Sequence, residues 1–136
     1  MKKIGLISAK RISPGCVEAV YVNRQAAGAQ VAEAFFIANE AVEVVAASES
    51  HSTADSGTLT IDIVKEASGA AAGASTTSVL AATFDGKGTK DTPQRKAGSG
   101  TLASKQLAKG DRLSFKPSAV GGELTGVIIT VELKYI

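Results

Sequence analysis

Hydrophobic and polar residues alternate along much of the chain, which is the pattern of a β-strand with one buried and one exposed face. The alternation is strict in the segments 59–63 and 112–116. It is longest at the C-terminus, where a strand would place alternate apolar side chains on one face. These side chains are Val127, Ile129, Val131, Leu133 and Tyr135. The pattern predicts strands that each cover one side of a core.

Further strands are expected where β-branched or apolar residues recur. The segment 31–37 places Val31, Phe35 and Ile37 on one face, whereas Leu102 and Leu107 fall on opposite faces of the weaker candidate 101–107. The predicted strands, about seven in all, cover 17–22, 31–37, 42–47, 59–63, 101–107, 112–116 and 127–135. Turn-forming residues separate them, so we expect one all-β domain, an antiparallel sandwich or barrel.

Four segments depart from the strand pattern. Residues 26–47 are rich in Ala and Glu and also fit an amphipathic helix, although the β-branched Val42, Val44 and Val45 disfavour it. The low-complexity segment 67–77 and the Gly-rich segment 85–100 are predicted to be mobile surface loops. Between these loops, residues 78–82 are predicted to form one helical turn after Thr77.

Residues 1–16 are predicted to form an extended, basic N-terminal arm ahead of a sandwich domain at 17–136. The arm carries Lys2, Lys3, Lys10 and Arg11, and residues 1–15 contain no acidic residue. Its apolar run ends at Lys10, which makes it shorter than the roughly 7–15 residues of a signal peptide. No stretch of the sequence resembles a membrane span.

The composition argues against most kinds of catalysis. Ala, Gly, Ser and Thr make up 61 of the 136 residues, whereas the chain has one His, one Cys and no Trp. Metal sites need clusters of His, Cys or carboxylates, so we expect no metal and no cofactor. The net charge of +2 is too small to indicate nucleic-acid binding, and one cysteine cannot form an internal disulfide. The sequence therefore predicts a protein that is not an enzyme.

Three short motifs are better explained as structure than as chemistry. Asp55-Ser56-Gly57 matches the aspartic-protease triplet, but the residues before it are polar rather than an apolar strand, which favours a turn. Gly86-Lys87-Gly88-Thr89 lacks the earlier Gly and the following Ser or Thr of a phosphate-binding loop. His51 is the single histidine, and no other residue marks it as part of a catalytic group.

Four short motifs occur in an order that resembles one family of viral proteins. They are Gly57-Thr58-Leu59, Leu80-Ala81-Ala82, Gly110-Asp111-Arg112-Leu113 and Thr125-Gly126-Val127 with its following strand. In this order, over about residues 30–136, the chain resembles the small jelly-roll decoration (cement) proteins on the capsids of tailed bacteriophages. The resemblance implies a jelly-roll-like β-sandwich and a structural protein of the virion.

Cement proteins of this family bind the outside of the capsid as symmetric oligomers and stabilise it by bridging neighbouring subunits. The resemblance therefore implies two partners, the phage major capsid protein and further copies of this chain as a homodimer or homotrimer. It also implies a location on the virion surface after synthesis in the host cytoplasm, with no contact to nucleic acid or membrane. The candidate contact residues are Lys2, Lys3, Ile4, Leu6, Ile7, Lys10 and Arg11 in the arm, and Lys87, Lys90, Arg95 and Lys96 in the long loop.

Other functions fit a small sandwich as well. A carbohydrate-binding or adhesin-like module would need an aromatic platform, and the chain has only four Phe and two Tyr. A hydrolase would have to use Asp55 or His51. A domain of a phage tail or head fibre would have the same fold as a cement protein.

Overall fold

The computed structural model describes residues 15–136, which form nine β-strands and one short helix. The strands of the first half are β1 (Cys16–Val22), β2 (Glu33–Ile37), β3 (Val42–Ser50) and β4 (Thr60–Glu66). The second half contains β5 (Phe84–Asp85), β6 (Gln94–Ala97), α2 (Leu102–Lys105), β7 (Gln106–Leu107), β8 (Arg112–Pro117) and β9 (Ile128–Tyr135). The prediction of an all-β domain is confirmed.

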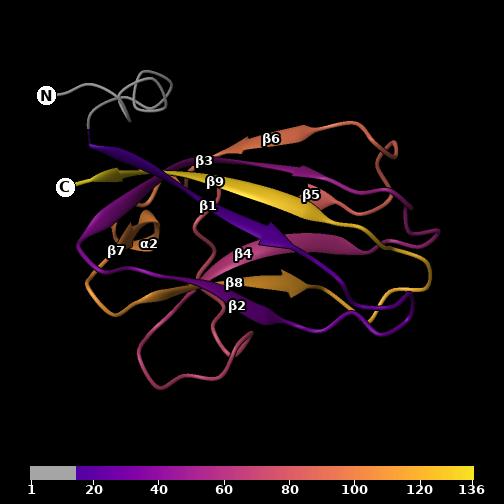
Figure 1. Cartoon of the computed structure of the whole chain (residues 1–136), viewed down its shortest axis with the longest axis horizontal. Helices are drawn as coiled ribbons and strands as arrows, with labels where there is room; N and C mark the ends of the chain where they lie inside the picture. Colours follow the sequence, from indigo (N-terminus) through magenta and orange to yellow (C-terminus); the bar gives the residue numbers. More distant parts are fainter. Residues whose placement is uncertain (1–14) are drawn as a thin grey trace, which may run out of the picture.

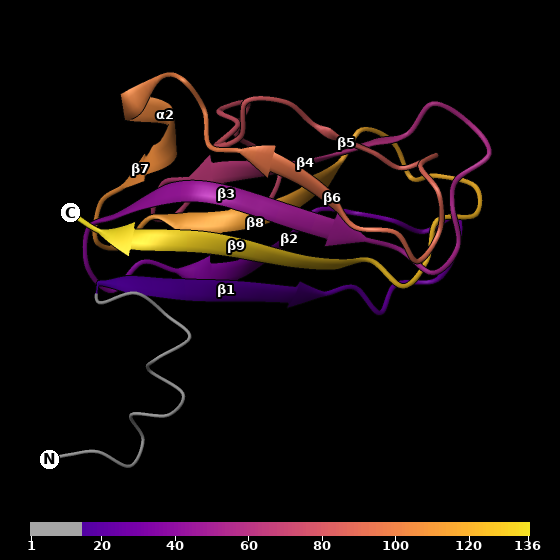
Figure 2. The same cartoon turned by 90° about the horizontal axis from the view of Figure 1, so that it is seen from above.

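The strands form two antiparallel sheets that pack face to face (Figures 1 and 2). One sheet, which we call sheet A, has the strand order β1-β9-β3-β6, and the short β7 also pairs with β3. The other, sheet B, has the order β2-β8-β4-β5. The chain crosses between the sheets at most connections, and β4 with β5 is the one pair of consecutive strands that are neighbours in sheet B. This is the antiparallel, jelly-roll-like sandwich that the sequence analysis expected.

The core lies between the inner faces of the two sheets and consists mainly of aliphatic side chains. Ile129, Val131 and Leu133 of β9 are buried from sheet A, and Ile61, Ile63 and Phe115 are buried from sheet B. Tyr21 of β1 stacks on Phe115, with 4.8 Å between ring centroids, and joins the two sheets near one side of the sandwich. Small side chains at Ala19, Ala38 and Ala47 complete the buried cluster, as a composition rich in alanine requires.

Period-two alternation located most inward-facing side chains correctly. Residues 59, 61 and 63 are buried, and so are residues 127, 129, 131 and 133. Tyr135 is an exception, because its side chain is 49% exposed where β9 reaches the end of the sandwich. The predicted common face of Val31, Phe35 and Ile37 is also wrong, since Val31 and Ile37 are 56% and 60% exposed. An irregularity in the pairing of β2 with β8, between Ala34 and Phe36, breaks the alternation there.

The local sequence pattern predicted the wrong secondary structure in three segments. Residues 78–82 form no helical turn, because Ser78 and Leu80 make isolated bridges to Val64 and Gly98. The weaker strand candidate 101–107 is instead the helix α2 followed by the two-residue strand β7. The predicted long loop 85–100 contains β6, which pairs with β3 from Ala46 to Glu49. In each case a long-range backbone partner or a local helix replaced the expected structure.

Replacing Phe115 should cost much more stability than replacing the exposed Tyr135. We expect Phe115→Ala to lower the free energy of unfolding by about 3–5 kcal/mol, because it removes a fully buried ring and leaves a cavity between the sheets. Tyr135→Ala should lower it by less than about 1 kcal/mol. Equilibrium unfolding in urea measures both, and equal losses would contradict this description of the core.

Candidate functional site

The connection between β5 and β6, residues 86–93, lies at the end of the sandwich where β3 ends (Figure 2). We call this segment the β5–β6 loop. Two of the predicted contact residues, Lys87 and Lys90, lie on it and are exposed. Its backbone is held to the body of the protein by a hydrogen bond from the Asp91 N–H to the His51 carbonyl, at 2.7 Å. The loop therefore presents its cations from a defined position.

A buried polar cluster under the loop fixes this position. His51 and Glu49 are each 1% exposed, and His51 Nδ1 lies 2.8 Å from Glu49 Oε2. The other ring nitrogen, Nε2, lies 2.8 Å from the carbonyl oxygen of Gly88 in the loop. Gln94 of β6 donates from its Nε2 to Glu49 Oε1 and to the Asp85 carbonyl, at 3.1 and 2.8 Å. The cluster joins the ends of β3 and β5, the start of β6 and the loop between them.

His51 carries a positive charge when Glu49 is ionised. The Gly88 carbonyl can only accept a hydrogen bond, so Nε2 carries a proton, and the Glu49 carboxylate requires a proton on Nδ1. Burial by itself lowers the pKa of His51, but the hydrogen bonds to Gly88 and Glu49 outweigh it and the pKa is raised. Burial also raises the pKa of Glu49, although His51 opposes this. The folded protein therefore holds the His51 proton to a higher pH than an ordinary histidine does, because its pKa is raised.

Two glycines of the Gly86-Lys87-Gly88 motif are required by packing. A Cβ atom on Gly86 would lie 2.8 Å from the Leu59 carbonyl oxygen, and one on Gly88 would lie 2.8 Å from Gln94 Nε2. A side chain at Gly86 would push the loop away from the backbone of Leu59, and one at Gly88 would displace the Gln94 side chain. The two glycines thus allow a close approach of the loop backbone to the body of the protein.

The predicted contact residues in the described part do not form one cluster. Lys87 and Lys90 are on the β5–β6 loop, whereas Arg95 lies on the outer face of β6 and forms an ion pair with Glu132 of β9. Lys96 is the next residue of β6 and is half-buried. The other predicted contact residues lie outside the described part of the chain. They are Lys2, Lys3, Ile4, Leu6, Ile7, Lys10 and Arg11. Lys87 and Lys90 are therefore the candidate contacts that the structure leaves exposed on the loop.

Asp55, from the Asp55-Ser56-Gly57 motif, stabilises a junction between two turns. Its carboxylate accepts hydrogen bonds from the backbone N–H groups of Gly57 and Gly122, each at 2.8 Å, and of Glu123 at 3.3 Å. These hydrogen bonds, led by the one from Gly122, lower the pKa of Asp55. The side chain is 5% exposed. The predicted turn is confirmed, and both carboxylate oxygens are engaged by the backbone.

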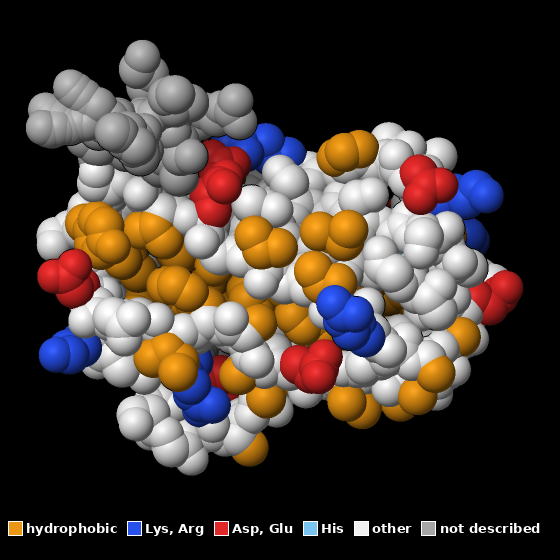
Figure 3. Space-filling model, in the orientation of Figure 1, with side chains coloured by type: hydrophobic (Ala, Val, Ile, Leu, Met, Phe, Trp, Pro, Cys, Tyr) orange, Lys and Arg blue, Asp and Glu red, His pale blue; other side chains and the backbone are white. Residues whose placement is uncertain are grey.

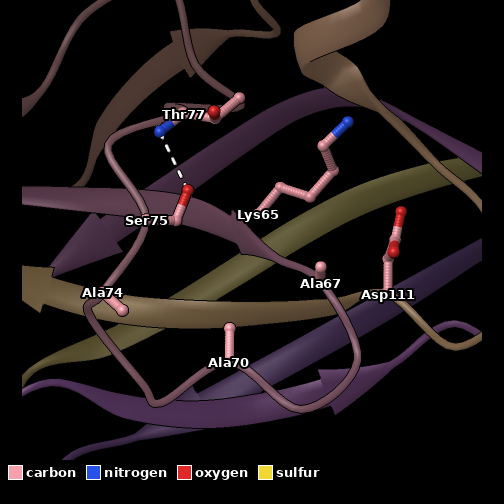
Figure 4. A pocket seen from close by; sticks show the side chains of 7 residues that line it. All are labelled: Lys65, Ala67, Ala70, Ala74, Ser75, Thr77 and Asp111. Atoms are coloured by element: carbon pink, nitrogen blue, oxygen red, sulfur yellow. Dashed lines mark hydrogen bonds between the residues drawn. The ribbon is translucent and has the colours of Figure 1, made fainter.

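A pocket of about 470 Å³ lies beside the segment 67–77 and is lined by Ala67, Ala70, Ala74, Ser75, Thr77, Lys65 and Asp111 (Figure 4). Its two charged residues stabilise neighbouring backbone. Lys65 Nζ donates to the carbonyls of Ala103 and Gln106, at 2.6 and 3.0 Å, and Asp111 accepts from the Ala108 N–H at 2.9 Å. The remaining lining is small and mostly apolar, so the pocket offers little chemistry for recognising a ligand.

The segment 67–77 is itself attached to sheet B by three charged side chains. The buried Glu66 accepts from the Ser75 N–H at 3.0 Å, and Lys116 Nζ donates to the Ser75 carbonyl at 2.6 Å. Arg112 donates to the carbonyls of Ala67 and Ala70. These contacts fix where the segment runs, and its mobility stays a prediction.

Within residues 15–136, no group of three or more His, Cys, Asp or Glu side chains could hold a metal ion. No helix in this range is long and apolar enough to cross a membrane. Comparisons with family models, with curated proteins and with solved structures found no match to this chain. The site therefore has to be interpreted from its own geometry.

Sequence reasoning identified Lys87 and Lys90 but missed the cluster that positions them. One signal was available: Glu49 and His51 are two positions apart at the end of a strand, so their side chains point to the same face. Their partner Gln94 is distant in sequence, and pairing of β6 with β3 brings it near. That pairing could not be inferred from the pattern of Gln94–Ala97, which has no apolar alternation.

The protein should lose stability as the pH rises through the raised pKa of His51. The folded state holds the His51 proton more tightly than the unfolded chain, so this contribution is complete below the ordinary histidine pKa of about 6.5 and disappears above the folded value. The raised pKa of Glu49 acts in the same direction. Urea unfolding at a series of pH values above neutrality should show the decline in the natural protein and a flatter profile in His51→Gln. A stability that increases over this range would contradict the assignment.

Asp55 should act in the opposite direction. Its lowered pKa stabilises the folded state at neutral pH, and this contribution is lost as the pH falls through the folded value. Asp55→Asn replaces one acceptor by an amide donor that faces backbone N–H groups, so we expect a loss of about 1–3 kcal/mol at pH 7. Urea unfolding measures the loss, with the exposed Asp91→Asn as control. A cost no larger than that of the control would contradict the role of Asp55.

Proposed function

We propose that this protein is a non-catalytic structural subunit that binds the outside of a phage capsid and cements neighbouring major capsid protein subunits. The observation that carries the proposal is the β5–β6 loop, which holds the exposed Lys87 and Lys90 in place by a buried cluster of charged and polar groups. A preorganised loop binds without the entropic cost of ordering it. This arrangement suits recognition of a surface better than chemistry.

The charge on the loop defines the kind of surface it would contact. Lys87 and Lys90 are exposed, whereas the guanidinium of Arg95 is paired with Glu132. An acidic patch on the major capsid protein would complement the two lysines. Each exposed ion pair contributes little, about 0–1 kcal/mol, but attachment of an oligomer at several points multiplies the effect. Weak individual contacts are therefore compatible with stable attachment to a repeating shell.

The predicted arm would supply a second contact. Its cations and the apolar side chains of Ile4, Leu6 and Ile7 lie outside the described residues, so their role stays a prediction. The arm precedes β1, whereas the β5–β6 loop lies beyond the far end of β3. Both would serve the same lattice of capsid subunits in this proposal.

The alternatives receive less support from the positions of the side chains. A sugar-binding module needs exposed aromatic rings, but Phe84 and Phe115 are buried and Tyr21 hydrogen-bonds through its hydroxyl to Glu33 at 2.5 Å. Tyr135 is the most exposed aromatic residue and is not part of a platform. Asp55 and His51, the candidates for a hydrolase, each have their polar atoms engaged inside the fold. A tail-fibre or head-fibre domain would use the same loop on another partner.

Reversing the loop charges should weaken attachment to capsids. We expect Lys87→Glu with Lys90→Glu to reduce binding to purified capsids that lack this protein at least about tenfold, since two attractive contacts become repulsive. Co-sedimentation at two salt concentrations measures the change. Lys109→Glu is the matched control, because this exposed lysine lies between β7 and β8 near the start of β3.

The copy number in virus particles provides the independent check. Quantitative mass spectrometry should find this chain in a simple ratio to the shell protein, with hundreds of copies on a large capsid. Absence of the chain from particles would contradict the proposal, and a few copies per particle would transfer the loop contact to a fibre or tail. Unchanged capsid binding by the charge-reversed loop would exclude this loop as the contact.

A further inference from the structure

The edge strands β1, β2, β5 and β6 differ in how they are protected against pairing with another chain. β6 carries the charged Arg95 and Lys96, and β5 is only two residues long. β2 has the irregularity between Ala34 and Phe36. Short edges, charges and bulges are the usual means by which sheets avoid edge-to-edge association. β1 has only one of them, the exposed charge of Glu18: its seven residues contain no Lys, Arg or Pro, and its pairing with β9 is regular throughout.

Among residues 15–136, no strand pairs with the outer side of β1, where its backbone presents a regular row of donors and acceptors. The Gly15 carbonyl accepts from the Tyr135 N–H at 2.6 Å, and the Asn23 N–H donates to the Val127 carbonyl at 2.9 Å. Since alternate residues of an antiparallel strand face the same neighbour, the odd-numbered residues of β1 bond to β9. The N–H and C=O groups of the even-numbered residues, 16, 18, 20 and 22, therefore point away from sheet A.

Apolar side chains accompany this free edge. Val20 and Val22 are 56% and 48% exposed on the outer face, and Ile128, the pairing partner of Val22, is 49% exposed. Between β1 and β2, the partly buried Val17 and Phe35 pack against the core from the open side of the sandwich. Figure 3 shows hydrophobic side chains as a band across this side of the molecule. The edge and the band together place outward-facing backbone groups and apolar side chains on one surface.

We propose that β1 pairs antiparallel with β1 of a second copy of this chain, about a twofold axis at Ala19. The even-numbered residues must face one another, and in this register Cys16 lies opposite the partner's Val22 and Glu18 lies opposite the partner's Val20. All seven residues of β1 take part. Sheet A then continues across the axis into the sheet A of the second copy.

Neighbouring registers are less favourable. A shift by one residue would place the odd-numbered residues of one β1, which already bond to β9, opposite the even-numbered residues of the other β1. The hydrogen bonds between the two strands could then not form. A shift by two toward the N-terminus would place Glu18 opposite the partner's Glu18, and like charges directly opposite destabilise a sheet. A shift by two toward the C-terminus would leave only the segment 18–22 of each β1 strand paired with the partner. A strand pair with its flanking band is a small interface, so we expect a dissociation constant of about micromolar order.

An engineered thiol at position 22 tests this register directly. In Val22→Cys, the new thiol would face the partner's native Cys16 at a Cα separation of about 5.5 Å, which suits a disulfide. Within one chain the two thiols are about 20 Å apart along the strand and cannot join. Mild oxidation of the full-length variant should therefore give a covalent dimer on a non-reducing gel. Mass spectrometry should identify a peptide pair that links Cys16 of one copy to the introduced thiol of the other.

Ile128→Cys is the matched control for this experiment. Its side chain is as exposed as that of Val22, but it lies one strand further from the edge, about 10 Å from the partner's Cys16 in the dimer. This variant should stay monomeric on the gel. Equal cross-linking of both variants would mean random encounter and would overturn the proposal.

A charge pair tests the same register without a covalent bond. Val20→Glu would face the partner's Glu18, whereas Val20→Lys would form two symmetric ion pairs with it. Since each substitution changes two symmetric cross-strand pairs, sedimentation should show dimerisation at least about tenfold weaker for the Glu variant than for the Lys variant. Val20 is exposed in one copy, so both variants should fold, and circular dichroism checks this.

The oligomeric state of the unmodified chain provides the last test. A monomer at about 100 μM, a trimer, or the same effect from both Val20 variants would overturn the proposal. The inference goes beyond the proposed function, because a dimer joined through β1 forms in the absence of capsids. Capsid binding that fails while the dimer persists would contradict the capsid role alone.

Discussion

The insertion of β9 between β1 and β3 is the interaction on which the sandwich depends. β9 pairs with seven residues of β1 and eight of β3, and its alternate residues Ile129, Val131 and Leu133 fill the core from sheet A. The partner strand β1 is more than 100 residues earlier in the chain. Sheet A can therefore close only after nearly the whole chain has been made, and long-range closure of this kind slows folding. It also determines which backbone groups of β1 face outward.

Several buried or partly buried charged groups of this protein stabilise its loops. His51 and Glu49 hold the β5–β6 loop, Asp55 joins two turns, and Arg112 attaches the alanine-rich segment to sheet B. A core built from aliphatic and small residues gives long loops little apolar surface to pack against. Hydrogen bonds from buried charged side chains to loop backbone replace that packing, and they are stronger than bonds between neutral groups.

The fold class and most of the core followed from period-two alternation, because that pattern is set directly by which face of a strand is buried. The prediction failed where another constraint determined the structure. The irregularity at Ala34 and Phe36 shifted the faces of β2, and Tyr135 lies where β9 outruns the core. β6 has no apolar alternation because it is an edge strand whose outer face carries Arg95. The buried polar cluster of Glu49, His51 and Gln94 depends on the pairing of β6 with β3, so it could not be predicted from local sequence.

The two surfaces singled out by the structure lie on different parts of the molecule. β1 is at one side of sheet A, β6 is at the other, and the β5–β6 loop projects from the end where β6 begins (Figure 2). In the proposed dimer, pairing through β1 would therefore leave the loops of both copies free. A unit with two loops related by a twofold axis can contact two subunits of a lattice at once. The second contact then forms at a high effective concentration, which strengthens attachment without any additional interaction in either copy.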